Sequence, residues 1–328
     1  MSTPDTMQAI VQDTYGPTEV LELRDVPVPT IGDDEVLVRV RAAGVDAGVW
    51  HLMEGVPYAV RLVSGLRAPK TAVRGLDVAG TVVEVGKDVT RFAPGDEVFG
   101  TCAGSFAEYA SAGQDKLAAK PTTMTFEQAA AVPVSACTAL QAVHHRGGVR
   151  AGQRVLVIGA AGGVGSFAVQ IAKAYGAEVT GVCSTSKVDL VRALGADHVI
   201  DHTVEDLAGS GGSYDLIIDI AGNRSLSSLR RLLTTHGTVM LVGGEGGNRW
   251  IGRLDRPLRG MLWSLFIRHD LKNFIATEPL EDLLTLTDLI EAGKVTAAVD
   301  RTYPLGQVPD AIRLQKAGGA RGKLVIVM

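Results

Sequence analysis

A glycine-rich loop at residues 159–165 constrains the fold of this chain more than any other feature. It reads Gly-Ala-Ala-Gly-Gly-Val-Gly and follows the apolar run Arg-Val-Leu-Val-Ile at residues 154–158. A short, continuous apolar run is typical of a strand that is buried on both faces of a sheet. Residues 162–175 then have helical periodicity and end before Gly176. The segment therefore predicts a strand, a tight turn and a helix, in that order.

The residue types in this loop favour a bound pyrophosphate. Glycine permits a tight turn, and the lack of a side chain lets a ligand approach the backbone closely. The free amides and the dipole at the N-terminus of the following helix then attract an anion. We predict a dinucleotide site at Gly159, Ala161, Gly162, Gly163 and Val164, with Val164 also packing the helix against the sheet. The alternative is a glycine-rich turn without a ligand.

The segments after the loop continue to alternate between strand and helix patterns. Strands are expected at residues 178–183, 198–200, 214–220 and 238–242, and helices at residues 188–194 and 226–233. Such alternation predicts an α/β fold with a doubly wound parallel sheet, known as a Rossmann fold.

The first third of the chain has a different pattern. Apolar or alternating runs at residues 36–42, 78–85 and 97–99 are separated by Gly, Pro and Asp, which suits a mostly antiparallel β-barrel domain. Residues 126–145 have helical spacing with a break at Pro133, and residues 280–291 form a further expected helix. We expect a last strand, residues 323–327, to return to the first domain.

Length and composition exclude several classes of function. A chain of 328 residues is too long for one compact core and indicates two domains. A net charge of −4 and an aromatic content of 5% argue against nucleic-acid binding. Three cysteines without a CxxC pair suit a reducing compartment. The N-terminus has no signal-peptide pattern, and no apolar run is long enough to cross a membrane. We expect a cytoplasmic protein.

The end of the second strand after the loop bears on the choice between NAD and NADP. In NAD sites, an Asp or Glu at that point commonly binds the ribose 2′-hydroxyl. Here the strand at residues 178–183 is followed by Ser-Thr-Ser-Lys, and no carboxylate occurs before Asp189. Hydroxyls and an ammonium suit a 2′-phosphate, which a carboxylate would repel. We predict that Ser184, Thr185 and Lys187 favour NADPH over NADH. Alternatively the hydroxyls cap the next helix, and both roles are compatible.

Together, several motifs place the chain in a known family. They are Gly-Leu-Asp-Val-Ala-Gly-Thr-Val at 75–82, Arg-Phe-Ala-Pro-Gly-Asp-Glu-Val-Phe-Gly at 91–100, the glycine loop, Leu-Gly-Ala-Asp-His-Val-Ile-Asp at 194–201 and Gly-Lys-Leu-Val at 322–325. With them the chain resembles the medium-chain dehydrogenase/reductase superfamily, and within it the zinc-free quinone oxidoreductase-like branch. The resemblance covers nearly the whole chain.

This resemblance implies a domain organisation. A chaperonin-10-like (GroES-like) catalytic domain would comprise residues 1–125 and 275–328, and a Rossmann domain would comprise residues 126–274, with a cleft between them. It also implies a homodimer that acts on a small-molecule substrate, without nucleic acid or membrane.

Departures from the zinc-dependent branch predict that no metal is bound. Zinc alcohol dehydrogenases carry an early Cys and a Gly-His-Glu, where this chain has Gly-Val-Asp at 44–46 and Gly-Leu-Asp at 75–77. Leu76 cannot ligate zinc, which needs three or four N, S or O ligands. The four-cysteine structural lobe is also missing from the sequence. Without a Lewis acid, simple ketones and alcohols are harder to polarise, whereas quinones and enones need less activation.

Three residues are the candidates for chemistry. Asp46 stands where the quinone oxidoreductases usually have Asn, near nicotinamide and substrate. It would anchor an amide or hydroxyl there or, if buried, act as a protonated donor; alternatively it is a solvated turn residue. Tyr58 and His51 lie where the family lines its cleft and could donate a proton. For both, packing or surface exposure is the alternative. Hydride transfer belongs to the cofactor, so orientation alone would suffice.

The remaining cofactor residues come from other segments. Thr138 matches a family position on the nicotinamide side, or bonds back to a helix carbonyl. His202 stands where relatives place a Tyr near the adenosine phosphate, or is simply exposed. Ala221, Val242 and Gly243 follow strands at the carboxyl edge of the sheet, where a cofactor should pass. Lys323, in the C-terminal motif, is assigned to the same site.

A basic, aromatic stretch at residues 249–268 has three interpretations: cleft lining, which we favour, a dimer contact, or a membrane surface. We predict an NADPH-dependent reductase of quinones or α,β-unsaturated carbonyls. One alternative is an alcohol/ketone dehydrogenase or enoyl-thioester reductase. An alternative of another class is an NADPH-binding regulator without turnover.

Overall fold

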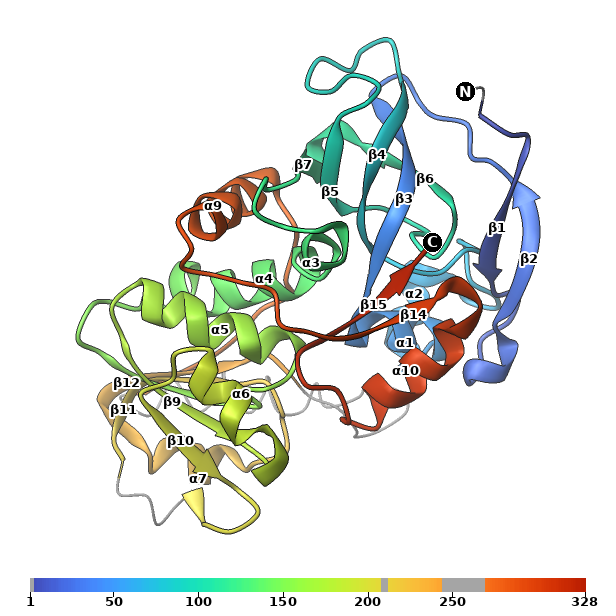
Figure 1. Cartoon of the computed structure of the whole chain (residues 1–328). Coiled ribbons are helices and arrows are strands. Elements are labelled where there is room, and N and C mark those ends of the chain that lie inside the picture. Colours follow the sequence, from blue (N-terminus) through green and yellow to red (C-terminus); the bar gives the residue numbers. More distant parts are fainter. Residues whose placement is uncertain (1–2, 208–211, 244–268) are drawn as a thin grey trace. The chain divides into compact units, whose positions relative to one another are not determined.

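The computed structural model describes residues 3–207, 212–243 and 269–328 (Figure 1). The chain divides into two compact units. Unit 1 comprises Met1–Cys137, Thr277–Ala292 and Ala297–Met328, and unit 2 comprises Thr138–Ala276 and Gly293–Thr296. The predicted domain boundary at residue 125 stays a prediction; in this division, residues 126–137 are grouped with unit 1.

Unit 2 is built on a parallel sheet with the strand order β10-β9-β8-β11-β12-β13. All five strand pairs are parallel. The strands are β8 Arg154–Ile158, β9 Glu178–Cys183, β10 His198–Asp201, β11 Tyr214–Asp219, β12 Leu233–Leu241 and β13 Asp270–Asn273. The chain runs outward from β8 to β10 on one side and then returns to β11 on the other. This order confirms the predicted doubly wound Rossmann sheet.

Helices α5 (Gly163–Ala174), α6 (Val188–Ala193) and α7 (Leu226–Arg230) connect these strands. The expected packing role of Val164 stays a prediction. This residue is half-buried, whereas Phe167 and Ile171 are the fully buried large apolar side chains of α5. The helix expected at residues 226–233 is too long, because Leu233 already pairs with Tyr214 as the first residue of β12.

Unit 1 is a mostly antiparallel sheet with the strand order β14-β15-β3-β4-β5-β7, and β6 pairs with β3. These strands are β3 Glu35–Val45, β4 Asp77–Val85, β5 Glu97–Thr101, β6 Tyr109–Gly113, β7 Leu117–Ala119, β14 Val299–Pro304 and β15 Lys323–Val327. A separate antiparallel pair joins β1 (Thr6–Val11) to β2 (Glu22–Pro27). This arrangement confirms the mostly antiparallel domain predicted from the turn pattern.

The helices of unit 1 are short. They are α1 Ala47–Glu54, α2 Arg61–Ser64, α3 Phe126–Ala130, α9 Leu280–Glu291 and α10 Val308–Lys316, while α4, Pro133–Leu140, crosses the division between the units. The expected helix at 126–145 is thus interrupted at Pro133, as predicted, and ends in a π-helical turn, Gln141–His145. A capping box of Thr125 and Gln128 starts α3.

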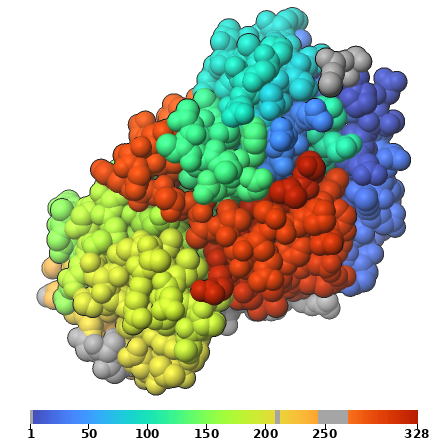
Figure 2. All heavy atoms as spheres, in the orientation of Figure 1, coloured from blue at the N-terminus to red at the C-terminus, as the bar shows by residue number. Residues whose placement is uncertain are grey.

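The C-terminal segment closes the core of unit 1. β15 pairs antiparallel with β3, which confirms the predicted return of the last strand. Val308 and Ile312 of α10 are buried in one cluster with residues of β3 and α1. Arg313 of α10 also pairs with Glu19, and Figure 2 shows the C-terminal segment (red) beside residues of the N-terminal segment (blue) in unit 1.

Candidate active site

The glycine loop of unit 2 makes a turn that only glycine can form. Gly159 has φ +89°, a conformation that L side chains rarely adopt. A Cβ on Gly165 would lie 2.0 Å from the Gly159 carbonyl oxygen, so α5 could not begin so close to β8 with a larger residue there. The N-cap of α5 is Gly162, and no side chain caps this helix end. Its first amides are therefore left for an anion.

Neighbouring strand ends lie beside this loop. The Ala221 amide, directly after β11, donates to the carbonyl oxygen of Ile158 at 3.3 Å. Val242 and Gly243 follow β12, and a Cβ on Gly243 would lie 1.7 Å from the Ile220 carbonyl oxygen. Side chains are thus missing from the backbone at these glycines along the carboxyl edge of the sheet, at the point where the strand order reverses. A dinucleotide fits this cradle.

The residues predicted to distinguish NADPH from NADH at the ribose 2′-position lie near the end of β9. Ser184 is half-buried and makes no capping hydrogen bond, and the His202 amide donates to the Cys183 carbonyl oxygen at 3.0 Å. The Thr185 hydroxyl lies 2.7 Å from that of Thr203, which also donates to Asp201 Oδ1 at 2.7 Å. The sequence analysis missed these last two residues. Their hydrogen bonds engage the Thr185 hydroxyl.

A buried ionic cluster of Asp46, Asp77, Ser135 and Lys323 lies in unit 1. Lys323 Nζ is 2.5 Å from Asp46 Oδ1 and 3.2 Å from both Asp77 Oδ2 and Ser135 Oγ. Ser135 donates to Asp46 Oδ1 at 2.7 Å. Asp46, Lys323 and Asp77 are only 6%, 1% and 0% exposed. Asp46 is therefore not a solvated turn residue.

Strand register explains how such distant residues meet. Leu324 of β15 pairs with Val45 of β3, which places Lys323 next to Asp46 at the strand end. Asp77 begins β4, the other neighbour of β3. Gly44 makes room for it, because a Cβ there would lie 2.7 Å from Asp77 Oδ2. The cluster is therefore a product of the sheet rather than of any local motif.

One proton is shared unequally by the two carboxyls. Burial alone would raise the pKa of Asp46, but the Lys323 ammonium and hydrogen bonds from Asp77, Lys323 and Ser135 together lower it. Burial, reinforced by the Asp46 charge, raises the pKa of Asp77 well above its usual range. Asp46 Oδ2 is buried without a donor, and a protonated Asp77 can supply one. The cluster then holds one carboxylate and one ammonium, with no net charge.

These contacts bear on Lys323 as a predicted cofactor residue. Burial would lower its pKa, but the two carboxyls raise it above the ordinary lysine value, so it stays charged. Its three donors all have partners inside unit 1. In the structure, Lys323 therefore binds Asp46, Asp77 and Ser135 within the ionic cluster.

His51 and Tyr58 lie on the segment after Asp46. His51 Nδ1 is 2.9 Å from the Val56 carbonyl oxygen, so this nitrogen carries a proton and the Nε2 of a neutral ring does not. The His51 ring lies against Trp50, with centroids 3.6 Å apart. Tyr58 is half-buried, and the Arg61 guanidinium lies 4.7 Å from its ring centroid. Both roles stay predictions, as does that of Thr138, which is buried in α4.

Sequence reasoning missed three residues of unit 1. Asp77 and Ser135 complete the ionic cluster, and burial together with the Asp46 charge raises the pKa of Glu278. Asp77 belongs to a family motif, so its position was visible, but its protonated state was not. Nothing in the sequence marks Ser135 or Glu278, because only the folded chain brings them near Asp46.

Metal ligands do not gather in the part of the chain that the structure describes: no group of three His, Cys, Asp or Glu could hold an ion there. Burial and, to a lesser extent, the Asp77 charge raise the pKa of Cys102 to about 12, so in the metal-free chain it is a thiol at neutral pH. None of the helices found between residues 3–207, 212–243 and 269–328 is long and apolar enough to cross a membrane. The basic stretch at 249–268 lies outside the described residues.

Comparisons with known families match both parts of the chain. Residues 32–181 match a family described as the alcohol dehydrogenase GroES-like domain. Residues 194–326 match one described as zinc-binding dehydrogenase.

Individual proteins are similar over nearly the full length. The mitochondrial NAD(P)H oxidoreductase RTN4IP1 of Mus musculus is 34% identical over 98% of this chain and 89% of its own. An Arabidopsis thaliana protein called chloroplastic NADPH-dependent alkenal/one oxidoreductase is 33% identical over 99% of this chain and 80% of its own. The structure of a quinone oxidoreductase from Coxiella burnetii superposes with a TM-score of 0.87, at 29% identity, over 98% and 99% of the two chains.

Proposed function

The chain belongs to the medium-chain dehydrogenase/reductase superfamily, in its quinone oxidoreductase-like branch, and we propose that it reduces quinones or α,β-unsaturated carbonyls with NADPH. Its relatives along the whole chain are oxidoreductases, so it is an enzyme rather than a cofactor-binding regulator. The observation that carries the proposal is the glycine loop at the start of α5. Its backbone amides have no side-chain cap, and together with the helix dipole they can bind a pyrophosphate.

The end of β9 supports NADPH over NADH. Ser184 and Lys187 follow the strand directly, and His202 lies beside its last residue. A 2′-phosphate would be bound by a hydroxyl and two groups that can carry positive charge. Asp201 ends β10 at this edge, and hydrogen bonds from Thr185 and Thr203, which lower its pKa, hold its carboxylate within the turn. The NADPH-dependent name of one relative agrees with this proposal.

Within unit 1, the ionic cluster assigns Asp46 a positioning role. NADPH, when bound, supplies a hydride to the electrophilic carbon of the acceptor. The electrons of the acceptor's double bond then shift to its oxygen, which needs a proton. Asp46 is ionised and held by Lys323 and Ser135, so it fixes the start of α1 rather than giving up a proton.

We propose that Tyr58 donates the proton that the acceptor oxygen needs. His51 Nδ1 already donates to the Val56 carbonyl oxygen, so this hydrogen bond engages one side of the ring. A tyrosine hydroxyl can both donate and accept. Tyr58→Phe should lower kcat for an enone by roughly 100-fold and leave the Kd of NADPH unchanged. An unchanged kcat would remove Tyr58 from the proton transfer.

We also propose that turnover needs no zinc. Leu76 stands at the position of a zinc-ligating His in the zinc-dependent branch. Asp46 and Asp77, which could otherwise attract a cation, already enclose the Lys323 ammonium. The family matched by residues 194–326 carries a zinc-binding name, so the absence of zinc has to be tested directly.

The experiment is NADPH oxidation with a panel of quinones, enones and simple ketones, in the presence and absence of a chelator. We expect turnover of quinones or enones at a rate that the chelator does not change, and metal analysis without stoichiometric zinc. Turnover of simple ketones alone, or loss of all activity with the chelator, would overturn the proposal. A cytoplasmic location and a homodimer remain predictions, the latter for light scattering.

A further inference from the structure

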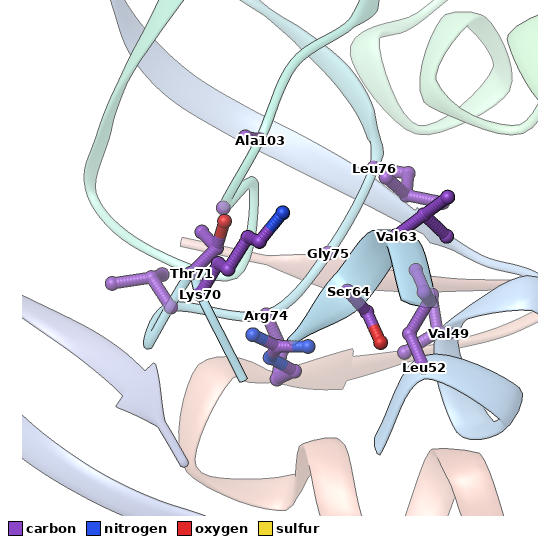
Figure 3. A pocket seen from close by; sticks show the side chains of 12 residues that line it. Val49, Leu52, Val63, Ser64, Lys70, Thr71, Arg74, Gly75, Leu76 and Ala103 are labelled. Carbon is purple, nitrogen blue, oxygen red and sulfur yellow. The ribbon is translucent and has the colours of Figure 1, made fainter. Parts of the chain in front are cut away.

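A pocket of about 240 Å³ opens in unit 1 next to the ionic cluster. Leu76, which lines it, directly precedes Asp77. Figure 3 shows two kinds of lining: Val49, Leu52, Val63 and Leu76 on one side, and Lys70 and Arg74 on the other. Both cationic residues come from the segment that leads into β4.

Arg74 is an unusual residue for such a lining. Its side chain is only 6% exposed, and Nε is buried without a hydrogen-bond partner. Among residues 3–207, 212–243 and 269–328, no carboxylate pairs with its guanidinium. Its backbone is fixed, because the Arg74 amide donates to Ile10 and its carbonyl oxygen accepts from Phe106. These bonds anchor the Arg74 backbone, while the described part of the chain gives its buried side chain no counter-ion.

A buried guanidinium without an anion is energetically costly, because the charge loses water and gains nothing in return. Burial lowers the pKa of Arg74 from its usual value, but an arginine remains charged at neutral pH. The nearby Ser64 hydroxyl bonds to the Val60 carbonyl oxygen and to Tyr15, so it does not meet this need. The five donors of a guanidinium match the two oxygens of a carboxylate or the oxygens of a phosphate.

The apolar wall indicates what else the ligand carries. Leu52 and Val63 cannot bind a fully hydrated ion, but they suit a short carbon chain. At roughly 30 Å³ per water molecule, the volume equals about eight waters. A small organic anion fits this space, with its charged end at Arg74 and its carbon skeleton along the apolar wall.

We propose that the acceptor of this enzyme carries an anionic group, a carboxylate or a phosphate, and that Arg74 binds this group in the pocket with Lys70 as the outer cation. Lys70 is exposed and sits at the pocket lining, where it would draw anions inward. The proposal rests on the proposed function for the identity of the reaction, but binding of the anion can be measured without turnover.

The kinetic test compares acetylacrylate with its methyl ester, which share one enone skeleton and differ in charge. Wild-type enzyme should show a kcat/KM that is roughly 10- to 100-fold higher for the acid. Arg74→Gln should bring this ratio near one while changing the value for the ester less than about threefold. The matched control, Arg67→Gln, removes an exposed arginine outside the pocket and should leave the ratio unchanged. An unchanged ratio in Arg74→Gln would overturn the proposal.

Binding provides the readout that is independent of activity. In an NMR titration, the saturated product levulinate should bind wild type more tightly than methyl levulinate, and Arg74→Gln should abolish this difference. Equal binding of the two to wild type contradicts the proposal. Failure of both acceptors to be reduced contradicts the proposed function instead, and the binding ratio then still decides the role of Arg74.

Two further arms complete the design. Inhibition competitive with the acceptor, by inorganic phosphate or by acetate, distinguishes the two anions with little contribution from the apolar wall: the more potent inhibitor identifies the group that Arg74 prefers. If Arg74→Gln does not fold, Arg74→Lys should keep the charge and retain part of the acid preference. If neither variant folds, the wild-type ratio decides, and a ratio near one overturns the proposal.

Discussion

The glycine loop of unit 2 and the ionic cluster of unit 1 show two ways to build a site. The loop uses the backbone: its features are a positive φ at Gly159, a close approach at Gly165 and an uncapped helix end. All of these come from seven consecutive residues. The cluster uses side chains that are far apart in sequence, with Asp46 and Lys323 separated by 277 positions. The first site depends on missing side chains, and the second depends on four that are present together.

This difference predicts different responses to mutation. A substitution in the loop should lower cofactor affinity more than folding stability, unless the added side chain clashes with the backbone. A change in the cluster should affect stability first, because it alters the charge balance of a buried group. The predictions below use this contrast.

Lys323→Met should have the largest effect. It leaves the Asp46 carboxylate buried without its ammonium, and such a break costs about 3–5 kcal/mol of unfolding free energy. The matched control is Lys87→Met, which breaks an exposed pair with Asp33 and should cost about 1 kcal/mol or less. Urea unfolding at neutral pH measures both.

The same variant has a defined pH dependence. The pKa of Asp46 is lowered in the folded wild type, so its contribution is present above the usual Asp pKa and is lost as pH falls through the folded value. The difference in unfolding free energy between wild type and Lys323→Met should therefore become smaller at acid pH. A gap that stays constant would show that Asp46 and Lys323 are not an ion pair.

Two substitutions in the loop separate the fold from the ligand. Gly165→Ala places a Cβ against the Gly159 carbonyl oxygen and should cost about 1–3 kcal/mol of stability together with NADPH binding. Gly162→Ala meets only an ordinary contact at 3.5 Å, so stability should change by less than about 1 kcal/mol. NADPH affinity should still fall in the second variant, because its Cβ enters the space for the pyrophosphate. Equal NADPH affinity in wild type and Gly162→Ala would remove the ligand from this loop.

Lys187→Glu should have a smaller and more selective effect. The new carboxylate repels a 2′-phosphate, so the Kd of NADPH should rise about tenfold or more while that of NADH changes little. Lys294→Glu, an exposed lysine of the same unit, serves as the charge control. Parallel losses for both cofactors would mean that Lys187 does not read the 2′-position.

Asp77→Asn should have the smallest effect, because a neutral amide replaces a carboxyl that is already protonated. We expect a change of about 1 kcal/mol or less at neutral pH. The raised pKa of Asp77 gives wild type a contribution that is full below the usual Asp pKa and is lost as pH rises through the folded value. In Asp77→Asn, unfolding free energy should not show this decrease as pH rises. A loss of several kcal/mol at neutral pH would show instead that Asp77 is ionised.

The same contrast explains what the sequence could predict. The loop, β8, β9 and the helix α9 have bounds close to the predicted ones, because periodicity and glycine punctuation are local signals. Local signals failed at Leu233, where pairing with Tyr214 favours strand over helix.

The cluster could not be predicted to the same degree. Asp46 was identified through the family pattern, but its partners depend on the register of β15 against β3 and on the space that Gly44 leaves. Lys323 was placed with the cofactor because its burial was unknown. Arg74 gave no signal in the sequence, since an arginine before a strand is ordinarily solvated; only its burial without a counter-ion marks it.

The central claim is that this chain moves a hydride from NADPH to a conjugated acceptor. The most direct measurement uses NADPH carrying deuterium at nicotinamide C4, in each of its two stereoisomers, with an enone as acceptor. We predict that one isomer gives a product with one deuterium on the former β-carbon, detected by mass spectrometry and NMR, with or without a chelator. A product that carries no deuterium from either isomer would contradict the account.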